Sequence, residues 1–258
     1  MRLMKRILSA AAVLALSASL LVGCSGGTAS SVPVSASSAA ESTVSSVEET
    51  ASSAVDENEA AAAQLLNDLT GSYQELWPVI LADEYQQTWL DVCTALVGED
   101  NAEAAFEKLS SMVTGDVYGE DAVKAYANGG GAYFCGFTNS LAILTFDGET
   151  STISGTDKDG NVLFSHTYHY IGMEPVHGLY EFESEDADSG EFTYFFLAPD
   201  TSAETYHIEF RYGSDAEALS QYDAGEYAYW VASGISTDCD QTMIDNCIEL
   251  FCTENLAG

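Results

Sequence analysis

The sequence predicts an α+β fold in which helices come first, an antiparallel β-barrel follows and one further helix ends the chain. Three observations predict it. Apolar residues recur at helical spacing before residue 128, they alternate at period two after the glycines at 129–131, and helical spacing returns after Asp240. About 200 residues rich in Tyr, Phe, Leu and Val follow residue 57, enough for one domain with a sizeable core.

The first 23 residues have the features of a bacterial lipoprotein signal peptide. Arg2, Lys5 and Arg6 precede an apolar run, which ends in Leu21-Val22-Gly23-Cys24 with a small residue before the cysteine. We expect acylation of Cys24 and anchorage at the outer side of the cytoplasmic membrane. An ordinary secretory signal cut near Gly23 is the alternative, and it differs only in the anchor.

Residues 24–60 are rich in serine and alanine and contain no aromatic residue, Lys or Arg. Such a segment cannot bury enough apolar surface to offset its chain entropy, so we expect a disordered linker. The linker would separate the lipid anchor from a single folded domain over 61–258.

The chain is strongly acidic, with 41 Asp and Glu against 7 Lys and Arg and a formal net charge of −34 at pH 7. The electrostatic field of so negative a chain repels nucleic acid and anionic lipid headgroups, and it attracts cations. We therefore exclude nucleic acid as a partner and expect contact with the membrane only through the lipid. A solvated acidic surface without any partner explains the same charge.

Two amphipathic helices are predicted before the barrel, and one after it. The first carries its apolar residues at Tyr85, Trp89, Val92, Cys93, Leu96 and Val97. The second, with Asp100 or Asn101 as its cap, carries Ala102, Ala105, Phe106, Leu109 and Val113. The last begins after the cap residue Asp240 and has Ile244, Cys247, Ile248 and Phe251 on one face.

Seven short segments alternate as strands do, and turn pairs such as Asp147-Gly148 and Asp159-Gly160 separate several of them. The order of a meander suggests a small antiparallel barrel. The segments are Tyr133–Phe137, Leu141–Phe146, Thr150–Thr156, Val162–Ile171, Leu179–Glu183, Glu191–Leu197 and Tyr206–Tyr212.

The sequence predicts no enzyme. It contains no Gly-x-Ser-x-Gly, His-Glu-x-x-His or Cys-x-x-Cys motif and no phosphate-binding glycine loop. Apart from Cys24 there are five cysteines, an odd number that cannot pair completely. Cys93 and Cys247 are expected as small apolar core residues. A bridge from Cys239 to Cys247 or Cys252 is conceivable if the protein is exported.

All four histidines fall in the β half, so a metal site would lie there. On an extended segment His207, Glu209 and Arg211 share one face, and the alternate residues form the core face. The polar face has two interpretations. Either it is in water with Glu209 and Arg211 neutralising each other, or it lines the mouth of the barrel and can take a cation. His166 and His169 lie on opposite faces of their strand.

Certain strings resemble the ZinT (YodA-type) metal-binding domain family, over about Leu65 to Leu256. The string Gly71-Ser72-Tyr73-Gln74-Glu75-Leu76-Trp77-Pro78 is similar to the family's opening Gly-x-Tyr/Trp-Gln-x-x-Tyr-Pro segment. Leu197-Ala198-Pro199 is similar to its Ile-Ala-Pro, and His207 to Gly213 to its His-x-His strand ending in Gly. The resemblance implies a lipocalin-like (calycin) barrel in an exported zinc-acquisition protein, with a metal ABC transporter as partner.

The resemblance implies a zinc site, but with a changed ligand set. His207 stands at the family's first strand histidine and Glu209 at the second, while Phe195 stands where a further histidine would precede Ala198-Pro199. We expect zinc to bind His207 and Glu209, completed by His166 or His177, and to bind weakly.

Three function classes follow. The first is a surface-anchored lipoprotein that binds a divalent metal, zinc above all, for acquisition or buffering. The second is a lipocalin-like binder of a small organic or peptide ligand in an aromatic-lined cavity. The third is an envelope interaction protein that binds no metal.

Overall fold

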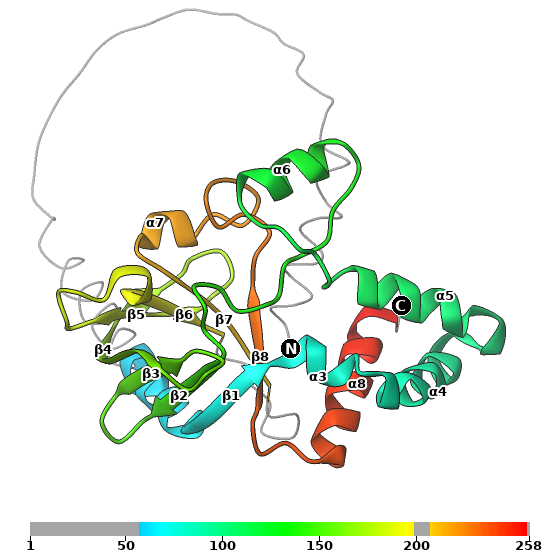
Figure 1. The fold of residues 1–258 in the computed structure, drawn as a ribbon, viewed down its shortest axis with the longest axis horizontal. Coiled ribbons are helices and arrows are strands. Elements are labelled where there is room, and N and C mark those ends of the chain that lie inside the picture. Colours follow the sequence, from blue (N-terminus) through cyan, green and yellow to red (C-terminus); the bar gives the residue numbers. More distant parts are fainter. Residues whose placement is uncertain (1–56, 199–206, 257–258) are drawn as a thin grey trace, which may run out of the picture.

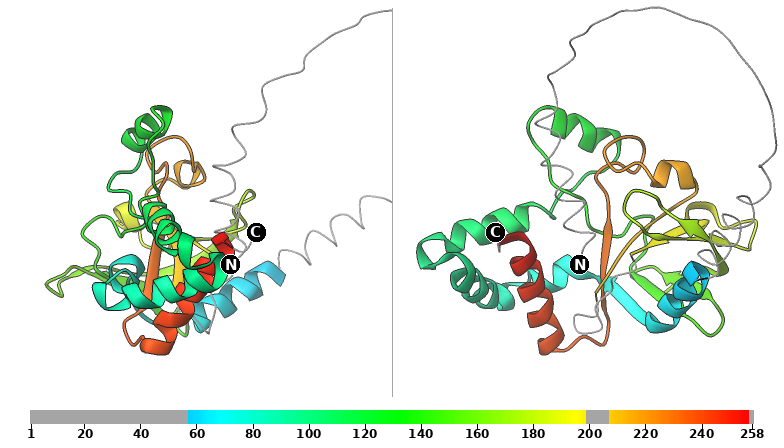
Figure 2. Two further views of the ribbon diagram at one scale, coloured as in Figure 1. Left: turned by 90° about the vertical axis from the view of Figure 1, so that its right-hand side faces the viewer. Right: turned by 180° about the vertical axis from the view of Figure 1, so that it is seen from behind.

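A computed structural model describes residues 57–198 and 207–256. The predicted signal peptide, Cys24 and most of the predicted linker lie outside these residues. Figure 1 shows a β-barrel beside a layer of helices, and the two further views of Figure 2 show the same separation. Within the described ranges, no helix is both long enough and apolar enough to cross a membrane.

Eight antiparallel strands form a closed barrel, in which each strand pairs with the next and β8 closes onto β1. Closure leaves no unpaired sheet edge. The strands are β1 (Gly71–Glu75), β2 (Ile143–Asp147), β3 (Thr152–Thr156), β4 (Val162–Met173), β5 (Tyr180–Ser184), β6 (Tyr194–Leu197), β7 (His207–Gly213) and β8 (Ala232–Ser236). The predicted α+β class with an antiparallel barrel is confirmed.

The barrel begins earlier in the chain than predicted, because β1 precedes most of the helices. A helix over 57–68 comes first and includes residues 57–60, which the sequence analysis assigns to the linker. Between β1 and β2 lie α3 (Leu76–Ile80), the 3-10 helix η1 (Asp83–Tyr85), α4 (Gln86–Val97), α5 (Glu99–Ser111) and α6 (Glu120–Ala127). Helices α3 to α6 therefore lie between the first and second strands of the barrel.

Two further predictions at the ends of the barrel are wrong. Residues 133–137 form no barrel strand; Phe134 makes only isolated bridges, to Thr114 and Trp230. The barrel also continues beyond Tyr212, because α7 (Ala216–Leu219) leads to β8. The first four residues of β8 are buried, so it lacks the alternation by which strands are recognised.

The helical layer forms largely as its periodicity predicts. Helix α8 (Gln241–Leu256) follows Asp240, whose Oδ1 accepts a hydrogen bond of 2.9 Å from the Met243 amide, as expected of a cap. Helix α5 starts instead after Gly98, at φ 84°, without a side-chain cap. Trp89 of α4 is fully buried, and its ring lies 6.1 Å from that of Phe251 on α8.

Aromatic side chains fill the barrel. The ring of Phe195 on β6 lies 5.9 Å from Phe164, 5.4 Å from Tyr168 and 5.3 Å from Tyr212, centroid to centroid. All four side chains are buried. Such interdigitated rings contribute packing energy and leave no room between them. The barrel around Phe195 is therefore a packed core, unlike the open aromatic cavity expected for a lipocalin-like ligand.

Candidate functional site

Strand β7 carries the residues that the sequence singles out, and both of its faces are covered. Phe210 and Tyr212 point toward the aromatic core, with ring centroids 6.3 and 5.3 Å from that of Phe195. On the other face Glu209 is 5% exposed and Arg211 is fully buried. The interpretation of this face as water-facing is therefore wrong.

Segment 219–227 covers the Arg211 end of that face. The guanidinium donates hydrogen bonds to the carbonyl oxygens of Leu219, Gln221 and Tyr227. Burial lowers the pKa of Arg211, and Tyr222, Tyr133 and Glu174 act in the opposite direction. The charge is thus held by carbonyl dipoles and an aromatic ring, an arrangement suited to a buried guanidinium.

His177 joins this buried group from the loop between β4 and β5. Its ring centroid lies 3.7 Å from that of Tyr222, and its Nδ1 lies 3.4 Å from Oε2 of Glu174. Glu174 is fully buried and accepts hydrogen bonds from the backbone amides of Val176 and His177. His177 therefore has a carboxylate partner within its own loop.

His166 lies elsewhere, on β4. Its Nδ1 is 2.9 Å from Oδ2 of Asp186, and its ring stacks on Phe164 at 5.9 Å. His169, on the same strand, is exposed. As the alternation of a strand requires, the two histidines face opposite ways.

The structure brings His207 and Glu209 to one face of β7 and gives His166 and His177 separate carboxylate partners. Among residues 57–198 and 207–256, no group of three or more His, Cys, Asp or Glu side chains is arranged to hold a metal ion. The predicted grouping of His207 and Glu209 with His166 or His177 is therefore not assembled in the described part of the chain.

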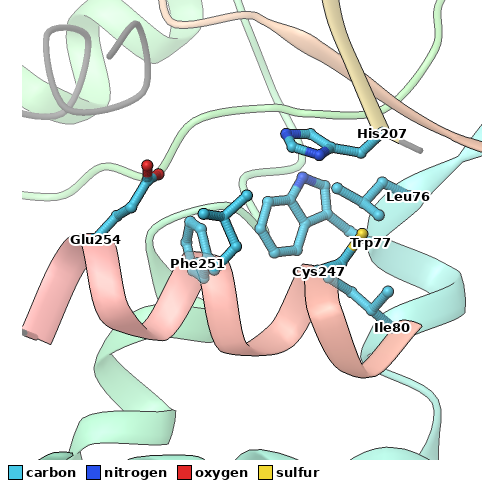
Figure 3. A pocket seen from close by; sticks show the side chains of 8 residues that line it. Leu76, Trp77, Ile80, His207, Cys247, Phe251 and Glu254 are labelled. Carbon is cyan, nitrogen blue, oxygen red and sulfur yellow. The ribbon is translucent and has the colours of Figure 1, made fainter. Parts of the chain in front are cut away.

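His207 borders a small pocket between the barrel and helix α8. Figure 3 shows its imidazole beside the indole of Trp77, and in this view the indole lies between the imidazole and α8. The pocket has a volume of ≈ 20 Å³, room for a water molecule or one ion. Its lining residues are Leu76, Trp77, Ile80, His207, Cys247, Leu250, Phe251 and Glu254.

Two of these lining residues, Cys247 and Glu254, are potential metal ligands that sequence reasoning missed. Cys247 was assigned to the core, and it is indeed only 4% exposed. Burial raises the pKa of its thiol to about 12, with a smaller contribution from Cys239. Glu254 lies about two turns further along α8, at i+7, which puts it on a similar face of the helix. The only sequence signal was this spacing, and nothing local connects α8 to β7.

Comparison with known proteins finds likeness in structure alone. No family model matches the chain, and no curated protein does. The crystal structure of the Zn(II)-bound ZinT-like domain of Streptococcus pneumoniae AdcA is 16% identical, with a TM-score of 0.45, over 71% of this chain and 89% of that domain. Zn(II)-bound AdcA from the same organism is 14% identical, with a TM-score of 0.42, over 72% of this chain and 35% of that protein. These neighbours contain the domain that the sequence strings resemble.

Proposed function

We propose that this chain is an exported, lipid-anchored protein that binds a divalent metal ion, zinc above all, for acquisition or buffering. The observation that carries the proposal is the pocket at His207. It is lined by an imidazole, a thiol and a carboxylate, from His207, Cys247 and Glu254. Zinc prefers nitrogen, sulfur and oxygen ligands of these kinds.

The proposed ligands come from two elements. His207 and Glu209 project from one face of β7, while Cys247 and Glu254 belong to α8. In the described residues no three ligand side chains converge. A bound ion therefore requires side chains to shift where β7 and α8 meet. We therefore expect weaker zinc binding than a preformed site of three histidines provides.

His166 and His177 are the alternative completing ligands. Each would have to leave its carboxylate, Asp186 or Glu174, before it could reach an ion at His207. Cys247 and Glu254 of α8, in contrast, already line the pocket at His207. They are therefore the preferred partners of His207 in this proposal.

Zinc binding should weaken as the pH falls. A thiol binds zinc as the thiolate, and burial raises the pKa of Cys247 to about 12, so the ion must displace its proton. The imidazole of His207 must also be neutral to bind. Binding should release protons, which calorimetry in buffers of different ionisation enthalpy detects.

Calorimetric titration of the purified protein with zinc chloride tests the proposal. The His207→Ala variant should bind at least tenfold more weakly than wild type, since one ligand is lost. The matched control is His169→Ala, which removes an exposed histidine from β4 and should leave the affinity unchanged. Equal binding by all three proteins removes the site at His207, and no binding by wild type removes the metal function.

A small organic or peptide ligand is the second candidate, and one observation favours it. Two open cavities, of ≈ 500 and ≈ 340 Å³, share the lining residues Glu75 and Pro78. Their volumes are within the range of small-molecule sites. The larger is lined in part by the β3–β4 turn at Lys158, and the smaller by Phe134 and Trp77. Binding of a ligand here should be unchanged in His207→Ala and lost in Glu75→Gln.

A further inference from the structure

Two cysteines on different helices of the helical layer face each other. Cys93 lies on α4 and Cys252 on α8, and the two helices pack together beside the barrel (Figure 1). Their Sγ atoms are 4.0 Å apart, although 159 positions separate them in the sequence. Both residues are fully buried. This is a different pair from the bridge of Cys239 that the sequence allows.

We propose that Cys93 and Cys252 form a disulfide bond when the protein matures outside the cytoplasm. The bond joins the two Sγ atoms, and the two thiols lose two protons and two electrons. A protein disulfide of the thiol-oxidase class accepts them and is reduced to a dithiol, by way of a mixed disulfide. A disulfide needs its sulfur atoms about 2.05 Å apart, so the pair has to close the remaining gap by small side-chain rotations.

The cysteines should be oxidised before α8 docks. Neither sulfur is accessible to an oxidant once the helices have packed. Once formed, the bond is shielded from reductants by the same burial.

The bond would fix one wall of the pocket at His207. Helix α8 contributes Cys247, Phe251 and Glu254 to that pocket, and Cys252 follows Phe251 directly. Tying α8 to α4 therefore restrains the α8 residues that line this pocket. This inference rests on the proposed export, but it is independent of zinc binding, since neither Cys93 nor Cys252 lines the pocket.

Peptide mapping of the wild-type protein tests the pairing. The full chain, refolded with oxidised glutathione, is denatured without reduction, alkylated and digested. We expect one disulfide-linked peptide that joins Cys93 to Cys252, and alkylation at Cys135, Cys239 and Cys247. Alkylation of all five of these cysteines, or a linked peptide from another pair, would overturn the proposal. This measurement does not involve zinc. It therefore tests the disulfide even if the protein proves not to bind metal.

Thermal unfolding provides the second measurement. A disulfide across so long a loop restricts the unfolded chain, so reduction of the bond should lower the melting temperature by roughly 5–10 °C. Cys252→Ala should lose the linked peptide and this dependence on reductant. Cys247→Ala, another buried cysteine on the same helix, should keep both. If Cys252→Ala does not fold, the fall in melting temperature on reduction is compared in wild type and Cys247→Ala. If reduction leaves the melting temperature of both proteins unchanged, the bond is contradicted.

Discussion

The guanidinium of Arg211 lies over the ring of Tyr222, with its Cζ 4.1 Å from the ring centroid. Tyr222 in turn contacts His177, so one ring connects β7 to the loop between β4 and β5. These buried polar groups hold segment 219–227 against the outside of the barrel. The same segment leads to β8, which closes the barrel.

Replacing Arg211 by Met should destabilise the protein by about 3 kcal/mol, because the carbonyls of Leu219, Gln221 and Tyr227 lose their donor in a buried place. Urea unfolding followed by tryptophan fluorescence measures the change. Lys158→Met, which removes an exposed cation, should change the free energy of unfolding by less than about 0.5 kcal/mol. Equal midpoints for the two variants would contradict this role of Arg211.

Glu174 should contribute stability that is lost in acid. Burial alone would raise its pKa, but the nearby side chain of His177 and hydrogen bonds from the amides of His177 and Val176 outweigh it and hold the pKa below the ordinary 4.5. The folded state therefore favours the ionised form. The contribution of Glu174 to stability is present above pH 4.5 and is lost as the pH falls through its lowered pKa.

The change Glu174→Gln should therefore flatten the fall in stability below pH 4.5. Urea midpoints measured between neutral and acid pH, for wild type and the variant, give the difference. Glu185→Gln replaces an exposed carboxylate and should follow the wild-type curve. Parallel curves for wild type and Glu174→Gln would show that Glu174 makes no such contribution.

Gly155 on β3 should not tolerate a side chain. A Cβ there would lie 2.4 Å from Cδ1 of Leu141 and 2.4 Å from Cε1 of Phe164. The Phe164 ring cannot easily move, because it stacks on Phe192 at 3.9 Å. Gly155→Ala should therefore cost about 2 kcal/mol through overpacking. Ser154→Ala, on the opposite face of β3, is the control, and chemical denaturation of both variants measures the difference.

Cys24→Ala tests the proposed lipid anchor. Without the acylated cysteine, the chain should be released into the medium or remain unprocessed at its signal peptide. Fractionation of cells followed by intact mass determination distinguishes these products from the wild-type lipoprotein. Ser25→Ala should behave as wild type. A Cys24→Ala protein that stays in the membrane and is cleaved at the same bond would refute lipidation.

The sequence by itself determined the elements whose pattern is local. Helices α4 and α8 carry apolar residues at helical spacing, and β2 to β7 alternate or are bounded by turn pairs, so each was recognisable without its neighbours. Strands β1 and β8 were not recognisable. Gly71–Glu75 has a single buried residue, and Ala232–Ser236 is buried on both faces. Both are strands because they pair with other strands and with each other.

Only the tertiary structure decided the character of the candidate site. A strand with His207, Glu209 and Arg211 on one face predicts a polar surface, yet Glu209 and Arg211 are buried, because segment 219–227 and helices α3 and α8 cover that face. The presence of Cys247 and His207 in one pocket, and the position of Cys252 against Cys93, have the same origin. Contacts between residues far apart in the chain depend on how the elements dock. Periodicity describes one element at a time, so it cannot predict how the elements dock.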